Sequence, residues 1–260
     1  MDLGSRPSAP PGTSASRPAP EGMLLINKPA GMTSHDVVLV VRRKLGVRRI
    51  GHSGTLDPMA QGLLVLLVGR ATKHQQAFQA HEKTYQAVLR LGTQTATGDA
   101  MGEPVRRAPI PPLDQARIAE ALASFRGPFV HTPPAYSAVK VQGRPAYWWA
   151  RRHHPVTLSP RVVQLTEITL VGWTPDTITF RVRCSAGTYI RTLAEAIAER
   201  LGAVGHLSDL IRLRVGRWSV EDAKPFAWVR DADPHMLIGC LLSIPYPAQD
   251  AGCSSRPPHR

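Results

Sequence analysis

An uninterrupted apolar run, Leu63 to Val68, constrains the fold of this chain more than any other short segment. Such a run without polar alternation is typical of a β-strand that is buried on both faces. It is far too short to cross a bilayer, which needs roughly 20 apolar residues. We therefore expect a buried strand here, with a carboxylate, Asp57, on the tight turn that leads into it.

The composition limits the class of protein. The chain has 260 residues, of which 43% are hydrophobic, enough for one large core or two smaller ones. Its cysteines, Cys184, Cys240 and Cys253, are far apart and form no CxxC pair, so we expect neither a disulfide framework nor a zinc site. The N-terminus lacks the basic-then-apolar pattern of a signal peptide. We predict a soluble, cytoplasmic protein without a membrane partner.

Positive charge is concentrated in the central part of the chain. The net charge is +13; residues 1–22 contribute zero and residues 231–260 contribute −1, so residues 23–230 carry +14. A body this basic is expected to attract a polyanion, and we predict nucleic acid. A protein with a solvated basic face is the alternative.

Composition divides the chain into three parts. Residues 1–22 hold five prolines and four serines and almost no large apolar side chain, which predicts a disordered tail. Residues 23–230 are predicted to form the globular body. Apolar periodicity fades from about residue 231, so residues 231–260 are predicted to form a short C-terminal tail.

Strands outnumber helices in the predicted body. Residues 83–91 and 177–184 alternate apolar and polar side chains, which predicts strands with one buried face, and residues 161–173 form a further strand. Helical spacing predicts helices with Ser34 and Thr188 as N-caps, and another over residues 113–127. This order indicates an α+β fold with a mixed, largely antiparallel central sheet and flanking helices.

Arg191 stands at an unfavourable place in its predicted helix. If Thr188 is the N-cap, Arg191 lies in the first turn, where the helix dipole disfavours a cation by about 0.3–1 kcal/mol. A surface arginine that reaches water is the simple explanation. The alternative is a buried carboxylate that the arginine keeps ionised by lowering its pKa. Asp57 is the candidate partner, although an aspartate before a proline is also common in ordinary turns.

Residues 129–154 interleave aromatic and basic side chains. Aromatic faces stack on exposed bases while lysine and arginine hold phosphates, which is how looped or single-stranded RNA is bound. A basic hairpin whose tryptophans belong to the core is the alternative. The residues predicted to contact RNA are Tyr136, Lys140, Arg144, Tyr147, Arg151 and Arg152.

Several sequence blocks together resemble the TruB family of tRNA pseudouridine(55) synthases. In chain order they are NKPAGMTSHDVV, GHSGTLDPMAQGLLVLLVGRATK, KTYQAVLRLGTQTATGD, PPAYSAVKVQGRPAY and CSAGTYIRTLAEAIAERLG. The resemblance runs from about Met23 to Lys224, roughly four fifths of the chain. Because independent blocks agree in order and spacing, it is far more specific than any single motif.

The resemblance implies a pseudouridine synthase fold and a role for several residues. Asp57 corresponds to the essential aspartate, Arg191 to the arginine that pairs with it, and Tyr85 to the tyrosine that stacks on the flipped uracil. Residues 124–152 correspond to an insertion that closes over the RNA loop. Further substrate-binding residues that the resemblance implies are His52, Tyr189, Leu210 and Lys28.

The implied reaction breaks the N1–C1′ bond of a uridine in the T arm of tRNA and rejoins the base through C5. No group enters or leaves, so we expect no cofactor and no metal. The chain likewise has no HExxH, Walker or PCxxC motif. Asp57 would act either as a nucleophile at C1′ or as a base that removes a sugar proton to give a glycal. We also expect a monomer that works without guide RNA.

The chain departs from the family pattern in two ways. Family members usually carry a further C-terminal RNA-binding module, often of PUA type, and we expect no complete module in residues 231–260. Ile211 also stands where an arginine is common, beside Arg212 and Arg214.

The sequence leaves three other functions to consider. A glycoside hydrolase needs two carboxylates that flank the bond, whereas only Asp57 lies in a suitable block. A non-catalytic RNA-binding module and a guide-RNA-dependent synthase of the dyskerin type are the remaining alternatives.

Overall fold

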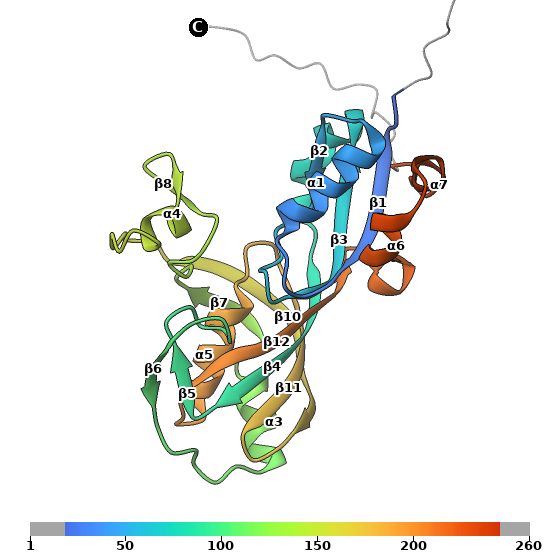
Figure 1. Cartoon of the computed structure of the whole chain (residues 1–260). Helices are drawn as coiled ribbons and strands as arrows, with labels where there is room; N and C mark the ends of the chain where they lie inside the picture. The colour runs from blue at the N-terminus through green and yellow to red at the C-terminus, as the bar shows by residue number, and fades with distance from the viewer. Residues whose placement is uncertain (1–18, 245–260) are drawn as a thin grey trace, which may run out of the picture.

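A ten-stranded sheet runs through the computed structural model, which describes residues 19–244 (Figure 1). Eight strands form one row in the order β14-β1-β3-β12-β4-β11-β10-β7, while β2 pairs with β3 and β13 with β12. The β1–β14 and β3–β12 pairs are parallel, and the other pairs in this sheet are antiparallel. The predicted α+β fold with a mixed, largely antiparallel sheet is therefore confirmed.

The bounds of the elements are as follows. The main-sheet strands are β1 (Gly22–Lys28), β2 (Ile50–His52), β3 (Gln61–Val68), β4 (Lys83–Leu91), β7 (Gly127–His131), β10 (Arg161–Trp173), β11 (Thr177–Cys184), β12 (Gly205–Val215), β13 (Trp218–Ser219) and β14 (Lys224–Pro225). Two small hairpins pair β5 (Thr93–Thr95) with β6 (Pro104–Arg107) and β8 (Lys140–Val141) with β9 (Arg144–Pro145). The helices are α1 (Ser34–Leu45), α2 (Gln75–Ala80), α3 (Gln115–Ala123), α4 (Ala146–Ala150), α5 (Ile190–Arg200), α6 (Phe226–Asp231) and α7 (Pro234–Gly239), with 3-10 turns η1 (Gly69–His74) and η2 (Val220–Asp222).

Strand β3 is buried on both faces, as its apolar run predicts. Its even-numbered residues, from Leu64 to Val68, belong to the large core. Its odd-numbered residues, from Leu63 to Leu67, pack in a smaller core around Phe78. Because alternate side chains of a strand point to opposite faces, a strand between two cores must be apolar at every position.

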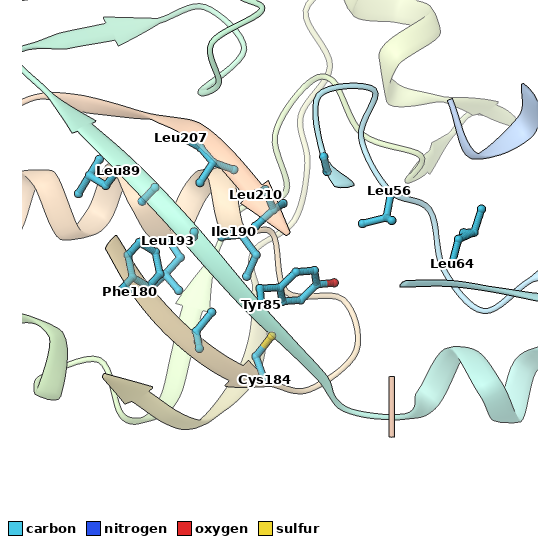
Figure 2. Packing of buried hydrophobic residues seen from close by; sticks show 14 of the residues in the cluster. Leu56, Leu64, Tyr85, Leu89, Phe180, Cys184, Ile190, Leu193, Leu207 and Leu210 are labelled. Carbon is cyan, nitrogen blue, oxygen red and sulfur yellow. The ribbon is translucent and has the colours of Figure 1, made fainter. Parts of the chain in front are cut away.

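The strands that were predicted to have one buried face form the other end of the large core. Alternate residues of β4, from Tyr85 to Leu91, are buried while those between them are more accessible. Figure 2 shows Leu89 of β4, Phe180 of β11 and Leu193 of α5 gathered in this core. Helix α5 thus covers this face of the sheet with its apolar side, as its spacing predicts.

The N-cap predicted for α1 is wrong by one residue. Thr33 is the N-cap: its Oγ1 accepts a hydrogen bond from Asp36 N at 3.1 Å, and Asp36 Oδ2 accepts one from Thr33 N at 2.8 Å. This reciprocal capping box satisfies two backbone donors, which a cap at Ser34 would not do. Ser34 instead bonds to the backbone of Leu56, in the turn that carries Asp57.

The N-cap predicted for α5 is wrong as well. Thr188 Oγ1 donates to Ser185 O at 2.9 Å, inside the preceding turn, so it does not cap the helix. Helix α5 begins at Ile190, and Tyr189 stands at the N-cap position without a side-chain cap. Arg191 is therefore the second residue of the helix, in the first turn as expected.

The C-terminal part of the described chain packs against its beginning. Helices α6 and α7 both contact α1, and α6 also contacts β1. Backbone hydrogen bonds of 2.8 Å join Met23 and Leu242 in both directions. Most of the predicted N-terminal tail, residues 1–18, and residues 245–260 lie outside the described range. Within residues 19–244, no helix is both long and apolar enough to span a membrane.

The short parallel contact between β3 and β12 joins the two ends of the sheet (Figure 1). Gly62 of β3 pairs with Arg212 of β12, and its φ is +100°. A Cβ atom built on Gly62 would lie 2.3 Å from Arg212 O. The strands can approach this closely only because Gly62 has no side chain.

We therefore expect Gly62→Ala to lower the free energy of unfolding by at least about 2 kcal/mol, because it adds both a backbone clash and an unfavourable positive φ. Urea unfolding followed by circular dichroism would measure the change. Gly172→Ala in β10 is the matched control, since a Cβ there meets nothing within 4 Å. The control should stay within about 0.5 kcal/mol of the wild type. Equal effects of the two substitutions would contradict this account.

Candidate active site

The turn that carries Asp57 is held on both sides of that residue. Before Asp57, Leu56 N donates to Ser34 Oγ at 2.9 Å, and Ser34 Oγ donates to Leu56 O at 3.2 Å. After Asp57, Pro58 O accepts a hydrogen bond of 2.9 Å from Gly31 N. The start of α1 and the loop before it thus fix the backbone around the carboxylate.

Arg191 binds Asp57, as predicted. The Arg191 Nε atom lies 2.9 Å from Asp57 Oδ2, and the Arg191 side chain is only 4% exposed. Nη2 donates to Asp57 Oδ1 at 3.5 Å and to Tyr136 O at 2.8 Å, and Nη1 donates to Thr97 O at 2.9 Å. The cation at the wrong end of α5 is therefore explained by a carboxylate and two carbonyls that receive its hydrogen bonds.

A second carboxylate, Asp99, also lies beside Arg191 and was not predicted. Its Oδ2 is 3.7 Å from Arg191 Nε, and its side chain is 8% exposed. Thr97 Oγ1 and Met101 N both donate to Asp99 Oδ1, at 2.6 and 3.0 Å. Its only sequence signal is its place in the TATGD block, and a Gly-Asp turn is too common to indicate a site.

Loss of water and the charges of neighbouring side chains together set the pKa of Asp57. Loss of water raises the pKa above the ordinary aspartate value, Arg191 lowers it, and Asp99 raises it further. Loss of water dominates although 32% of the Asp57 side chain remains accessible. Arg191 thus lowers the pKa of Asp57 as expected, but loss of water outweighs this effect. An ionised Asp57 here is a stronger base than a free aspartate.

Tyr85 and Leu210 lie on neighbouring strands beside the carboxylate turn. Both are largely buried, Tyr85 on β4 and Leu210 on β12. Figure 2 shows the Tyr85 hydroxyl pointing out of the packed core, toward the side where Leu56 lies. Burial raises the pKa of Tyr85, so this hydroxyl stays protonated at neutral pH.

The other residues implied for substrate binding differ in their surroundings. Lys28 is fully buried, and its Nζ donates to Pro29 O and Met32 O at 2.8 Å; burial lowers the pKa of Lys28 to about 8. His52 Nδ1 accepts a hydrogen bond from Gly54 N at 3.3 Å, and burial lowers the pKa of His52. Tyr189 directly precedes α5, two residues from Arg191.

The residues predicted to contact RNA lie on an arm that projects from the sheet (Figure 1). The arm consists of the β8–β9 hairpin and α4, where cations lie over aromatic rings: Arg152 is 3.7 Å from the centroid of Trp148, and Arg151 is 5.5 Å from that of Tyr147. Lys140 and Arg144 are exposed on the hairpin. The tryptophans here are half-buried and lie outside the two apolar cores, unlike the alternative that placed them in the core.

One contact links the arm to the carboxylate. The carbonyl of Tyr136, at the base of the arm, accepts the hydrogen bond from Arg191. Among residues 19–244, no group of three histidine, cysteine or acidic residues is arranged to hold a metal ion.

The sequence of this chain is similar to a known protein family and to several of its members. The sequence model described as TruB family pseudouridylate synthase (N terminal domain) matches residues 42–190. A protein of Opitutus terrae named tRNA pseudouridine synthase B is 43% identical over 203 residues, 78% of this chain and 84% of that protein. A protein of Thermobifida fusca with the same name is 46% identical over 211 residues, 78% of this chain and 72% of that protein. A third with this name, from Burkholderia lata, is 44% identical over 82% of this chain and 66% of its own length.

Two solved structures contain a chain with a similar fold. One chain in a structure titled "Crystal Structure of a Cbf5-Nop10-Gar1 Complex" is similar with a TM-score of 0.65 and 26% identity, over 87% of this chain and 62% of that one. Another, in "Structure of H/ACA RNP bound to a substrate RNA containing 2'-deoxyuridine", has a TM-score of 0.60 and 25% identity, over 81% and 54%. This chain thus spans less than two thirds of either one.

The raised pKa of Asp57 predicts that Asp57→Asn stabilises the folded protein at neutral pH. A carboxyl whose pKa is raised by folding stabilises the fold below its unfolded-state pKa, and this contribution is lost as the pH rises through the folded-state pKa. Thermal unfolding should therefore give a higher midpoint for Asp57→Asn at pH 7, and a smaller difference near about pH 4.

Asp36→Asn is the control with the opposite sign. Hydrogen bonds from Thr33 lower the pKa of Asp36, so its contribution is present at neutral pH and is lost as the pH falls. This variant should gain no stability at pH 7. An Asp57→Asn protein that is less stable than the wild type at pH 7 would argue against a raised pKa.

Proposed function

The chain belongs to the TruB family of pseudouridylate synthases, and on that premise we propose that it isomerises uridine to pseudouridine in tRNA, at position 55 of the T loop. The observation that carries the proposal is the pairing of Asp57 with Arg191 in a protein of this family. It places one basic carboxylate, held by a buried guanidinium, beside an aromatic and apolar wall. A module that only binds RNA has no need for such a carboxylate.

The reaction exchanges one bond for another within the substrate. The N1–C1′ bond breaks, the uracil turns, C5 bonds to C1′, and the proton from C5 is lost while N1 gains one. Asp57 can act in two ways: its Oδ atom attacks C1′, or it removes a proton from the sugar to give a glycal. Both routes begin with an ionised Asp57 shielded from water.

Arg191 and Asp99 prepare the carboxylate for either route. Arg191 opposes the rise in the pKa of Asp57 that loss of water causes, which favours the ionised carboxylate. Its bonds to Thr97 O and Tyr136 O leave the guanidinium little freedom. Asp99 lies 3.7 Å from the same Nε atom that binds Asp57, so the arginine is held by both carboxylates and Asp57 would meet the ribose in a defined orientation.

Tyr85, Leu210 and Tyr189 are proposed to hold the flipped base. A uridine must leave its stack before C1′ can be reached, at a cost of a few kcal/mol. Stacking on the Tyr85 ring and contact with Leu210 offset part of this cost. His52 would occupy the space that the base leaves, and Lys28 supports the backbone next to Asp57 through its bond to Pro58 O at 3.4 Å.

The basic arm is proposed to bind the T arm of tRNA. Its cations would hold phosphates, while Tyr136 and Tyr147 offer rings for stacking. We also propose that the protein acts as a monomer and without guide RNA. Its relatives at 43–46% identity carry the name tRNA pseudouridine synthase B, whereas its identity to the chains from H/ACA complexes is 25–26%.

Asp57→Asn is expected to abolish pseudouridine formation and to keep RNA binding, because it removes the reactive carboxylate and changes no surface charge on the arm. A T-arm transcript incubated with the purified protein alone, with no other RNA, would be assayed for pseudouridine and for binding. Asp176→Asn, in an exposed turn beside Arg90, is the control and should match the wild type. Wild-type yields from Asp57→Asn would rule out the proposal in favour of a binding role.

Arg191→Ala is expected to move the acidic limb of the pH–rate profile to higher pH. Activity needs ionised Asp57, so it is present above the pKa of Asp57 and lost as the pH falls through it. Because Arg191 lowers this pKa, its removal raises the pKa further. The rate on the plateau should also fall, by about 10²-fold, as orientation is lost. Arg183→Ala is the control: it breaks an exposed ion pair with Glu82 and should not move the acidic limb of the profile. An acidic limb that stays in place in Arg191→Ala would contradict the pairing of Arg191 with Asp57.

A further inference from the structure

Arg212 is a buried arginine that the proposed reaction leaves without a role. It lies on β12 and is 1% exposed, which makes it one of the largest fully buried side chains of the protein. Within residues 19–244, none of the ion pairs involves Arg212. A cation without a carboxylate partner in the interior is costly, because removal from water is compensated by hydrogen bonds alone.

Arg212 hydrogen-bonds with the side chain of Tyr85, and its backbone acceptors all belong to one segment. Its Nε donates to Leu63 O at 2.7 Å, Nη2 to Gly54 O at 3.1 Å and Nη1 to Thr55 O at 3.4 Å. Gly54 and Thr55 precede Asp57, and Leu63 follows it. One rigid, planar group therefore holds the two ends of the turn that presents the carboxylate.

Arg212 also stands beside the residues proposed to hold the base. In the sheet register its direct neighbours are Tyr85 on β4 and Gly62 on β3. Leu210 precedes it by two residues on β12. Burial is the main cause of the lowered pKa of Lys28 and of His52, and the positive charge of Arg212 is the second cause for both. Arg212 therefore acts electrostatically on two further residues of this part of the site. In the described part of the chain, β12 is the strand that pairs both with β3, which follows the Asp57 turn, and with β4, which carries Tyr85.

We propose that Arg212 is a positioning residue, which fixes the Asp57 turn relative to Tyr85 and Leu210 by clamping Gly54, Thr55 and Leu63 to β12. The inference rests on the proposed function, since it concerns the alignment of Asp57 with the ribose of a base held against Tyr85. An apolar side chain of similar size would fill the same space without the cost of a buried charge. It would provide no hydrogen bonds to set the turn.

Arg212→Met and Arg212→Lys test this role. The single-turnover rate of pseudouridine formation would be measured at saturating T-arm RNA, together with the dissociation constant for the RNA and the folded fraction from circular dichroism. We expect Arg212→Met to react about 10²-fold more slowly per folded molecule, the loss that a misplacement of about 1 Å produces. Arg212→Lys keeps the charge but not the planar fork, so it should recover part of the rate, to within about tenfold of the wild type. Both should bind RNA within about threefold of the wild type, because Arg212 is buried.

Arg90→Met is the matched control. Arg90 lies on β4 at a distance from the Asp57 turn, is exposed and pairs with Asp176. Its loss should leave the rate unchanged.

Each result bears on the inference. Arg212 variants that react at the wild-type rate per folded molecule, or that lose only RNA affinity, would overturn it. If Arg212→Met does not fold, Arg212→Lys decides: a slower rate at saturation supports the role, and a wild-type rate overturns it. If the wild type forms no pseudouridine, both the proposed function and the role of Arg212 are contradicted. If the wild type is active and the variants react equally fast, only the role of Arg212 is contradicted.

Discussion

The geometry of the site depends on one buried guanidinium that is shared between two carboxylates. Arg191 lies 2.9 Å from Asp57 and 3.7 Å from Asp99, in surroundings that disfavour all three charges. A lone carboxylate here would bind a proton, and a lone arginine would be left without an anion. Together they keep one carboxylate oxygen basic and oriented. This requirement explains why three segments far apart in the chain must meet.

The sheet makes that meeting possible. Strand β12 pairs with β4 along most of its length and with β3 only at Ile211 and Arg212. The end of the sheet that carries Asp57 and the end that carries Tyr85 are thus joined through a short parallel contact. Gly62 allows the strands to approach there, and the Arg212 side chain reaches across to the turn before Asp57. The same contact therefore supports both the fold and the geometry of the site.

The proposed RNA-binding surface and the proposed catalytic carboxylate lie on different parts of the molecule. Cations and aromatic rings gather on the exposed arm, where water reaches them and salt would weaken the proposed contacts with phosphates. The charges around Asp57 are buried, so they act strongly over short distances. The Tyr136 carbonyl connects the two parts, because it binds the same arginine that holds Asp57.

The sequence by itself determined much of this protein. The apolar run in β3 and the alternation in β4 and β11 follow from local patterns, and the structure confirms them. The family resemblance implied the Asp57–Arg191 pairing, for which helix electrostatics left two explanations open, and the structure confirms it as well. The helix caps were misplaced because Ser34 and Thr188 have other hydrogen-bond partners nearby in space or sequence. The tertiary structure alone decided three things: the place of Asp99 beside Arg191, the clamp formed by Arg212, and the raised pKa of Asp57. Each depends on distances between segments remote in the chain and on the water that their packing excludes, and neither quantity is written in local sequence.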